Sequence, residues 1–186
     1  TKLLMNRRHF LSASAAAAAA ISMRPGLSYA ADGGTLVIRG ASDIEILDPA
    51  FQNGLLEEEV GRALFVSLNR LGDVREGTRW DPYAAKELKQ ISPTEIGFEL
   101  HDWLEWTGGH GKVTAEDVKF SFERIGLPPA AGAKESSYKG DWLHLTTVEV
   151  KSKYEGRIVL AKPRANIFDV VIADGSGCIV SKKAVE

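Results

Sequence analysis

The stretch WTGGHGKVTAEDVKFSFERI, residues 106–125, predicts a glycine-rich turn that leads into a capped amphipathic helix. Thr114 is a typical N-cap residue, and Asp117 three positions later completes the pattern of a capping box. Arg124 stands near the negative end of the helix dipole, and Gly126 ends the helix. The apolar residues that recur on one face at helical spacing are Val118, Phe122 and Ile125. This helix is therefore expected to pack against a core through that face.

The charge and composition are those of an acidic globular protein. The chain has 186 residues, of which 44% are hydrophobic and 26% are charged, enough for one ordinary core. Residues 1–30 hold four basic residues and no acidic residue, so residues 31–186 hold 19 basic and 25 acidic residues and a net charge of −6. This acidic balance excludes nucleic acid as a partner.

Residues 1–30 have the layout of a cleavable export signal, with a basic start after Met5, an alanine-rich apolar run and a small-residue end. The apolar run is too short to span a bilayer, and cleavage is predicted between Ala30 and Ala31. No cysteine lies near this point, so we expect a soluble periplasmic protein and not a lipoprotein. Export through the twin-arginine machinery is predicted from Arg7, Arg8, Phe10 and Leu11.

Beyond residue 31, segments with strand and helix patterns alternate, which predicts an α/β fold. Strands are expected at Thr35–Arg39, Lys89–Ser92, Glu95–His101, Leu145–Lys151 and Gly156–Lys162. Further helices are expected at Asn53–Leu68, at Ala84–Leu88, at Ala165–Ile172 and from Ser181 onward. The residues 127–140, rich in Pro, Ala and Gly, are expected to form a surface loop, and Glu57–Glu59 a solvated first helical turn.

No arrangement of residues predicts an enzymatic mechanism. Residues 108–114 fail as a phosphate-binding loop, because Val113 occupies the position of the required Ser or Thr. Residues 174–178 fail as the nucleophile elbow of a serine hydrolase, because Asp174 replaces the first glycine. The three histidines beyond residue 31 lack metal-ligand spacing, and Cys178, the single cysteine, is expected to be a small buried residue. We therefore expect no catalytic residue, no metal and no cofactor.

Residues 106–125 and four further segments follow one another as in a known family of transport proteins. The four segments are Gly34–Arg39, Ile46–Ala50, Arg79–Leu88 and Cys178–Val185. Together they resemble the extracytoplasmic solute-binding proteins of ABC importers, in the peptide/nickel-type branch (family 5). This resemblance implies a truncated lobe like that of type II periplasmic binding proteins, in which residues 31–186 form the amino-terminal part of the first of two lobes. The Gly-Gly-His-Gly turn before Thr114 departs from the Trp-His-Asp-Gly pattern of the family.

Members of this family close two hinged lobes around a solute and deliver it to permease subunits in the membrane. The resemblance therefore implies capture of a peptide or similar small solute, whose identity the sequence leaves open. By position in the motifs, the residues expected to contact the ligand are Phe51, Gln52, Asn53, Trp142, Ser176, Gly177 and Cys178. A core role for Trp142 is an equal alternative. Two other functions stay open: a secreted hydrolase, and a periplasmic interaction module without a role in transport.

Overall fold

The computed structural model describes residues 37–40, 42–73, 75, 77 and 79–186. The predicted export signal and its cleavage point between Ala30 and Ala31 lie outside these residues, and so do Thr35 and Leu36 of the first expected strand. The described remainder of that strand, residues 37–39, is exposed and has no partner strand among the described residues, so this part of the prediction is wrong. No helix in the described ranges is long and apolar enough to cross a bilayer.

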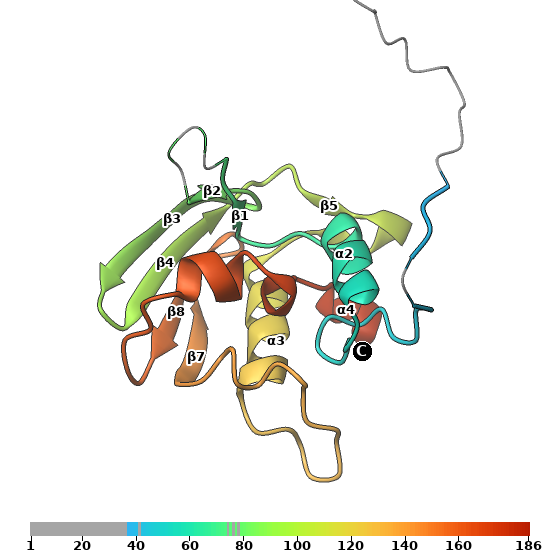
Figure 1. Cartoon of the computed structure of the whole chain (residues 1–186). Helices are drawn as coiled ribbons and strands as arrows, with labels where there is room; N and C mark the ends of the chain where they lie inside the picture. The colour runs from blue at the N-terminus through green and yellow to red at the C-terminus, as the bar shows by residue number, and fades with distance from the viewer. Residues whose placement is uncertain (1–36, 41, 74, 76, 78) are drawn as a thin grey trace, which may run out of the picture. The chain divides into compact units, whose positions relative to one another are not determined.

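A four-stranded antiparallel sheet organises the compact unit of residues 40–186 (Figure 1). Its strands, in spatial order, are β3 (Ala85–Ser92), β4 (Glu95–Leu100), β8 (Glu155–Leu160) and β7 (Leu145–Val150). Alternate side chains of β4 and β8 are buried, as expected where one face of a sheet covers a core. Helix α3 (Ala115–Gly126) packs against β7 on that side. The four predicted strands beyond residue 88 and the hairpin of the last two are thereby confirmed.

The short helix predicted at Ala84–Leu88 is wrong, because most of these residues begin strand β3. Ala85 pairs with Leu100 and Leu88 pairs with Phe98 of β4. All four of these side chains are buried. Cross-strand burial of this kind outweighs the helix propensity of a segment rich in Ala, Lys and Glu.

Shorter elements accompany the sheet. In chain order they are α2 (Leu55–Leu64), β1 (Asn69–Leu71), β2 (Trp80–Pro82), β5 (Glu105–Trp106), η2 (Thr107–Gly109), β6 (Gly111–Lys112), η3 (Ile167–Ile172), η4 (Gly175–Gly177) and α4 (Lys182–Val185). The helix expected at Asn53–Leu68 ends earlier, as α2, because Val66 pairs with Ile179 in a β-bridge. The helix expected at Ala165–Ile172 is only the π-helical turn η3, and the helix expected from Ser181 onward is confirmed as α4.

The largest buried side chains lie between α3 and the segments that follow it. The Phe122 and Trp142 rings stack with their centroids 4.2 Å apart, and the Trp142 indole N–H donates to the Ser176 carbonyl oxygen at 2.9 Å. The apolar face predicted for α3 is confirmed, because Val118, Phe122 and Ile125 are all buried. A filled aromatic position of this kind stabilises a fold by about 3–5 kcal/mol relative to alanine. The core of this unit therefore depends on α3.

One edge of the sheet, at β7, is covered by two side chains of α3. The Glu123 carboxylate accepts a hydrogen bond from the Val148 N–H at 2.8 Å, and the Lys119 ammonium donates to the Val148 carbonyl oxygen at 2.9 Å. Lys119 and Glu123 also bind each other at 2.8 Å. The pair thus occupies backbone groups that an open edge strand offers to other chains.

Glu57 is buried, so its predicted place in a solvated helical turn is wrong. Only 4% of the residue is exposed. Its carboxylate accepts hydrogen bonds of 2.8–3.0 Å from the backbone N–H groups of Glu45, Ile46, Asn53 and Gly54. These bonds, that from Ile46 foremost, lower the pKa of Glu57 from 4.5 to about 2. The carboxylate therefore anchors the loop of residues 45–54 to the start of α2.

This anchor predicts a loss of stability in acid that depends on Glu57. As the pH falls, Glu57 is protonated near pH 4.5 in the unfolded chain but only near pH 2 in the folded chain. The stabilisation is therefore complete above about pH 5 and is lost between about pH 4.5 and pH 2. We expect the free energy of unfolding in urea to fall less steeply across this window in Glu57→Gln than in the wild type. The exposed Glu59→Gln should keep the wild-type slope, and identical slopes for all three proteins would contradict the prediction.

Candidate functional site

One carboxylate, that of Asp117, joins two of the motif segments. Its Oδ2 accepts hydrogen bonds from the N–H and the hydroxyl of Thr114, both at 2.8 Å, and from the Trp106 indole N–H at 3.4 Å. Its Oδ1 accepts the backbone N–H of Lys182 at 2.9 Å. The predicted capping box of Thr114 and Asp117 is thereby confirmed, and Asp117 does more than cap the helix. It ties the turn at Trp106 and the start of α4 to α3.

Two further contacts attach motif segments to α3. The Ser121 hydroxyl accepts the Val180 N–H at 2.9 Å and donates to the Asp117 carbonyl oxygen at 2.7 Å. The Arg124 guanidinium binds both carboxylate oxygens of Asp48, in the loop between the first expected strand and α2. Partly buried arginine–carboxylate pairs of this kind are stronger and more directional than exposed pairs. The segments Ile46–Ala50 and Cys178–Val185 are therefore hydrogen-bonded to α3, and we call this arrangement the scaffold around α3.

An apolar pocket of about 480 Å³ opens where these segments meet. Its walls come from the loop at Asp48, the end of α2, the turn after Trp106 and helix α4. The apolar lining residues are Leu47, Leu64, Phe65, Trp106, Val180 and Val185. Because Asp48 is already paired with Arg124, this pocket offers a mainly apolar surface. Its volume is in the range of pockets that hold small ligands.

A second pocket, of about 310 Å³, lies beside the last turn of α2, β1 and the loop before η4, and we call it the arginine pocket. The lining residues that matter for its chemistry are Arg62, Phe65, Arg70, Leu71, Tyr83, Asp174 and Cys178. The Arg70 guanidinium lies over the Tyr83 ring, 5.6 Å from the ring centroid. Arg62 is hydrogen-bonded to Asp174, and its Nη2 lies 3.8 Å from Glu58. The pocket thus combines two guanidinium groups with an aromatic ring.

The thiol and hydroxyl near this pocket are inert. Cys178 is only 3% exposed, and burial raises the pKa of its thiol to about 12, so it is a neutral thiol at physiological pH. The expected small, buried cysteine is therefore confirmed. The Ser176 side chain is also buried, and its hydroxyl donates to the Val171 carbonyl oxygen at 3.3 Å. Neither group is placed to attack a substrate.

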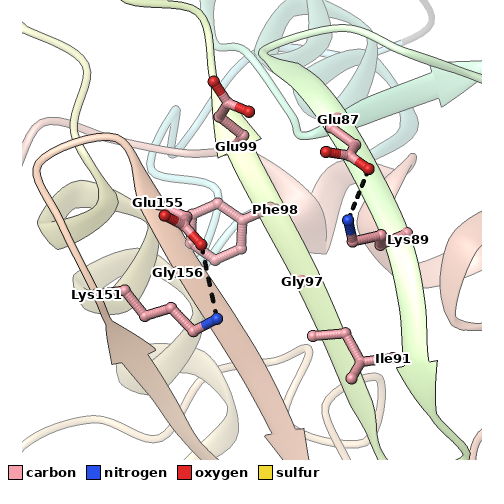
Figure 2. A pocket seen from close by; sticks show the side chains of 9 residues that line it. All are labelled: Glu87, Lys89, Ile91, Gly97, Phe98, Glu99, Lys151, Glu155 and Gly156. Atoms are coloured by element: carbon pink, nitrogen blue, oxygen red, sulfur yellow. Dashed lines mark hydrogen bonds and ion pairs between the residues drawn. The ribbon is translucent and has the colours of Figure 1, made fainter.

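A third hollow, of about 70 Å³, lies on the sheet around Gly97 (Figure 2). Figure 2 shows two ion pairs at its rim, between Lys89 and Glu87 and between Lys151 and Glu155. The distances are 2.8 Å and 3.6 Å. The hydrogen bond from Glu87 raises the pKa of Lys89 and keeps it charged. These pairs neutralise one another, and the hollow is too small for a solute.

The seven residues predicted to contact ligand fall into two groups in this structure. Phe51 is half-buried and Asn53 is exposed. The Phe51 ring faces the cationic groups of Arg124 and Lys134, whose distances to its centroid are 5.6 and 5.4 Å. The buried members are Gln52, Trp142, Ser176, Gly177 and Cys178. The ligand contacts of all seven residues stay a prediction.

Gln52 shows how closely this region is packed. It is fully buried, and neither its amide oxygen nor its amide nitrogen has a hydrogen-bond partner in the described part of the chain. Two glycines leave room for the amide: a Cβ on Gly61 would lie 3.0 Å from Oε1, and a Cβ on Gly175 would lie 2.8 Å from Nε2. Gln52 is therefore held between α2 and η4.

Sequence reasoning missed the arginine pocket. Arg62, Arg70 and Tyr83 come from α2, from β1 and from the residue after β2, and only Tyr83 lies within a motif segment. No spacing in the sequence links the three, because the fold alone brings them to one pocket. Within the described ranges, no group of three or more His, Cys, Asp or Glu side chains could hold a metal ion.

No family model and no curated protein sequence matches this chain, but solved structures do. MoaA from A. tumefaciens R10, a solute-binding protein in complex with mannopinic acid, matches with a TM-score of 0.65 at 25% identity, over 76% of this chain and 28% of its own. The murein tripeptide binding protein MppA of Escherichia coli matches with a TM-score of 0.60 at 25% identity, over 76% and 30%. NikZ from Campylobacter jejuni, in complex with Ni(L-His), matches with a TM-score of 0.60 at 25% identity, over 75% and 26%.

The chain spans less than a third of the length of these three proteins. Over that span it shares their mixed helix and sheet architecture, so the predicted α/β lobe of the type II periplasmic-binding-protein kind is confirmed. The resemblance seen in the motif segments and the match of the fold agree on one family. By both, the chain is similar to the peptide/nickel-type (family 5) solute-binding proteins of ABC importers, and it has the fold of a single lobe of such a protein.

Proposed function

We propose that the protein is the solute-binding component of an ABC importer, which captures a peptide or similar small solute and delivers it to permease subunits in the membrane. The observation that carries this proposal is the fold shared, at 25% identity, with binding proteins whose structures hold mannopinic acid and Ni(L-His). We assign residues 31–186 to the amino-terminal part of the first lobe and residues 1–30 to a twin-arginine export signal. The mature protein then works in the periplasm.

In this proposal the scaffold around α3 holds the surfaces that this lobe offers to a solute. A second lobe closes over the bound solute, and the permease recognises the closed form. Of the residues predicted to contact ligand, Phe51 and Asn53 reach the surface and Cys178 forms part of the arginine pocket. These positions and the two larger pockets are the first places to seek solute contacts.

The alternative of a secreted hydrolase has no support in the described residues. Its nucleophile in the predicted elbow, Ser176, is buried and bonded to a backbone carbonyl oxygen. The alternative of an interaction module without a transport role predicts no stabilisation by small solutes. That difference separates it from the proposal in one experiment.

The experiment is a thermal-shift screen of the full-length gene product with trialanine, mannopinic acid, Ni(L-His) and maltotriose. A solute that binds only the folded protein stabilises it by about 2.7 kcal/mol at a hundred times its dissociation constant, which raises the melting temperature by several degrees. We expect one of these classes to do so, and genes for permeases and P-loop ATPases to adjoin the coding sequence. If none of these solutes raises the melting temperature at millimolar concentration, the result would contradict the proposal.

Replacing Arg7 and Arg8 by lysine should keep the precursor in the cytoplasm if export is as proposed.

A further inference from the structure

The arginine pocket is a charged cavity to which the proposed function assigns no ligand group. Arg62, Arg70 and Tyr83 bring two guanidinium groups and a phenol ring to one cavity of about 310 Å³. A cavity of this volume is at the lower end of those that hold small ligands. The kind of ligand that this pocket can bind therefore depends on how much of its positive charge is already compensated by carboxylates.

The two arginines differ in what they already bind. Arg62 is hydrogen-bonded to Asp174 and lies near Glu58, so its charge is largely compensated. Arg70 has no carboxylate partner among the described residues, and its guanidinium lies over the Tyr83 ring. A guanidinium that lies over an aromatic ring and has no carboxylate partner has N–H groups available to an anion. Two arginines against one aspartate leave the wall of the pocket with a net charge of +1.

We propose that the arginine pocket binds a carboxylate group of the solute, with Arg70 as the direct partner of that group. The inference rests on the proposed function, because it names the part of the solute that this lobe recognises. The edge of a guanidinium presents two parallel N–H groups that match the two oxygens of a carboxylate. A monoanion neutralises the wall charge of +1, whereas a phosphate dianion would leave excess negative charge beside Asp174.

The apolar walls indicate what adjoins the carboxylate. Phe65 and Leu71 line the same pocket, and Leu71 is 59% exposed. An aliphatic group next to the carboxylate would remove this apolar surface from water. The pocket therefore fits a peptide with a free carboxyl end, or another amino-acid derivative of this kind, better than a neutral oligosaccharide.

The test measures the binding of matched probes to the full-length gene product by calorimetry at low salt. Trialanine and trialanine amide differ only in the carboxylate, and we expect the acid to bind at least tenfold more tightly. Arg70→Gln should remove this difference, and Arg70→Lys should restore only part of it because an ammonium lacks the two-pronged edge. Arg75→Gln is the matched control: Arg75 is exposed and outside the pocket, so this variant should bind as the wild type does.

Several results would overturn the assignment. They are equal binding of acid and amide, no binding of the acid, undiminished binding of the acid by Arg70→Gln, and competition by inorganic phosphate at the same concentration. If the amide or maltotriose binds and the carboxylate does not change the affinity, the solute-binding function is supported and the carboxylate site is contradicted. If no probe and no solute of the wider screen binds, both proposals are contradicted. Melting curves without ligand show whether each variant is folded. We expect the Arg70 variants to fold, because the Arg70 side chain is exposed.

Discussion

Replacing Asp117 by alanine is expected to lower the free energy of unfolding by about 3 kcal/mol. Its carboxylate is 5% exposed and accepts hydrogen bonds from Thr114, Trp106 and Lys182. Without this carboxylate, the partly buried donors of Thr114, Trp106 and Lys182 lose their acceptor. Each donor that water cannot reach lowers the free energy of unfolding by about 1–3 kcal/mol. The loss of the helix cap adds about 1 kcal/mol. Urea unfolding followed by tryptophan fluorescence measures the change.

Two variants test whether this effect belongs to the carboxylate of Asp117. Glu116→Ala removes an exposed acidic residue of the same helical turn and should change the free energy of unfolding by at most about 0.5 kcal/mol. Asp117→Asn keeps one acceptor oxygen and should cost less than Asp117→Ala. A stability of Asp117→Ala equal to that of the wild type would contradict the scaffold described around α3.

The scaffold explains why the motif segments resemble one family while the ligand stays unidentified. Asp117 and Ser121 on α3 bind backbone N–H groups of the segment Cys178–Val185, and Arg124 binds the Asp48 side chain in the segment Ile46–Ala50. None of these contacts selects a solute. The motifs therefore account for the fold of the lobe and do not identify a solute.

Features that depend on neighbouring residues could be predicted from the sequence. The capping box at Thr114 and the apolar face of α3 follow from spacings of three and four residues, and the structure confirms both. The strands from residue 89 onward follow from alternation and turn residues. Even the unusual turn is explained locally, because Gly108, Gly109 and Gly111 adopt φ values of 73°, 78° and 90°, which favour glycine.

Features that depend on distant residues could not be predicted. The burial of Glu57 depends on a loop that folds back over the start of α2 to present its N–H groups. The strand at Ala85 depends on a partner, β4, that the helical propensity of the segment does not reveal. The arginine pocket needs side chains from α2, β1 and the residue after β2. In each case the deciding contact lies outside the window that a local pattern covers.

Gly177→Ala is expected to destabilise the protein by about 3 kcal/mol, because the position has no room for a side chain. A Cβ there would lie 2.1 Å from the Ile172 carbonyl oxygen, 2.5 Å from the Ile172 carbonyl carbon and 2.6 Å from the Val171 carbonyl oxygen. These are backbone atoms of η3, so relief requires η3 or η4 to move. Such a shift would also disturb the hydrogen bond from Trp142 to the Ser176 carbonyl oxygen. The urea midpoint of the variant measures the loss.

This experiment also separates the two roles open to Gly177, which is among the residues predicted to contact ligand. A packing role lowers the stability of the ligand-free protein, whereas a role in ligand contact alone lowers affinity and leaves the ligand-free urea midpoint unchanged. Gly140→Ala is the control, because no atom lies within 4 Å of its Cβ position and its change should stay within about 0.5 kcal/mol. A wild-type midpoint for Gly177→Ala, with weakened solute binding, would return Gly177 to the binding site. A lowered urea midpoint for Gly177→Ala would show that the packing of η3 against η4 supports the fold. This packing also supports the arginine pocket, because Cys178, the residue after Gly177, lines that pocket.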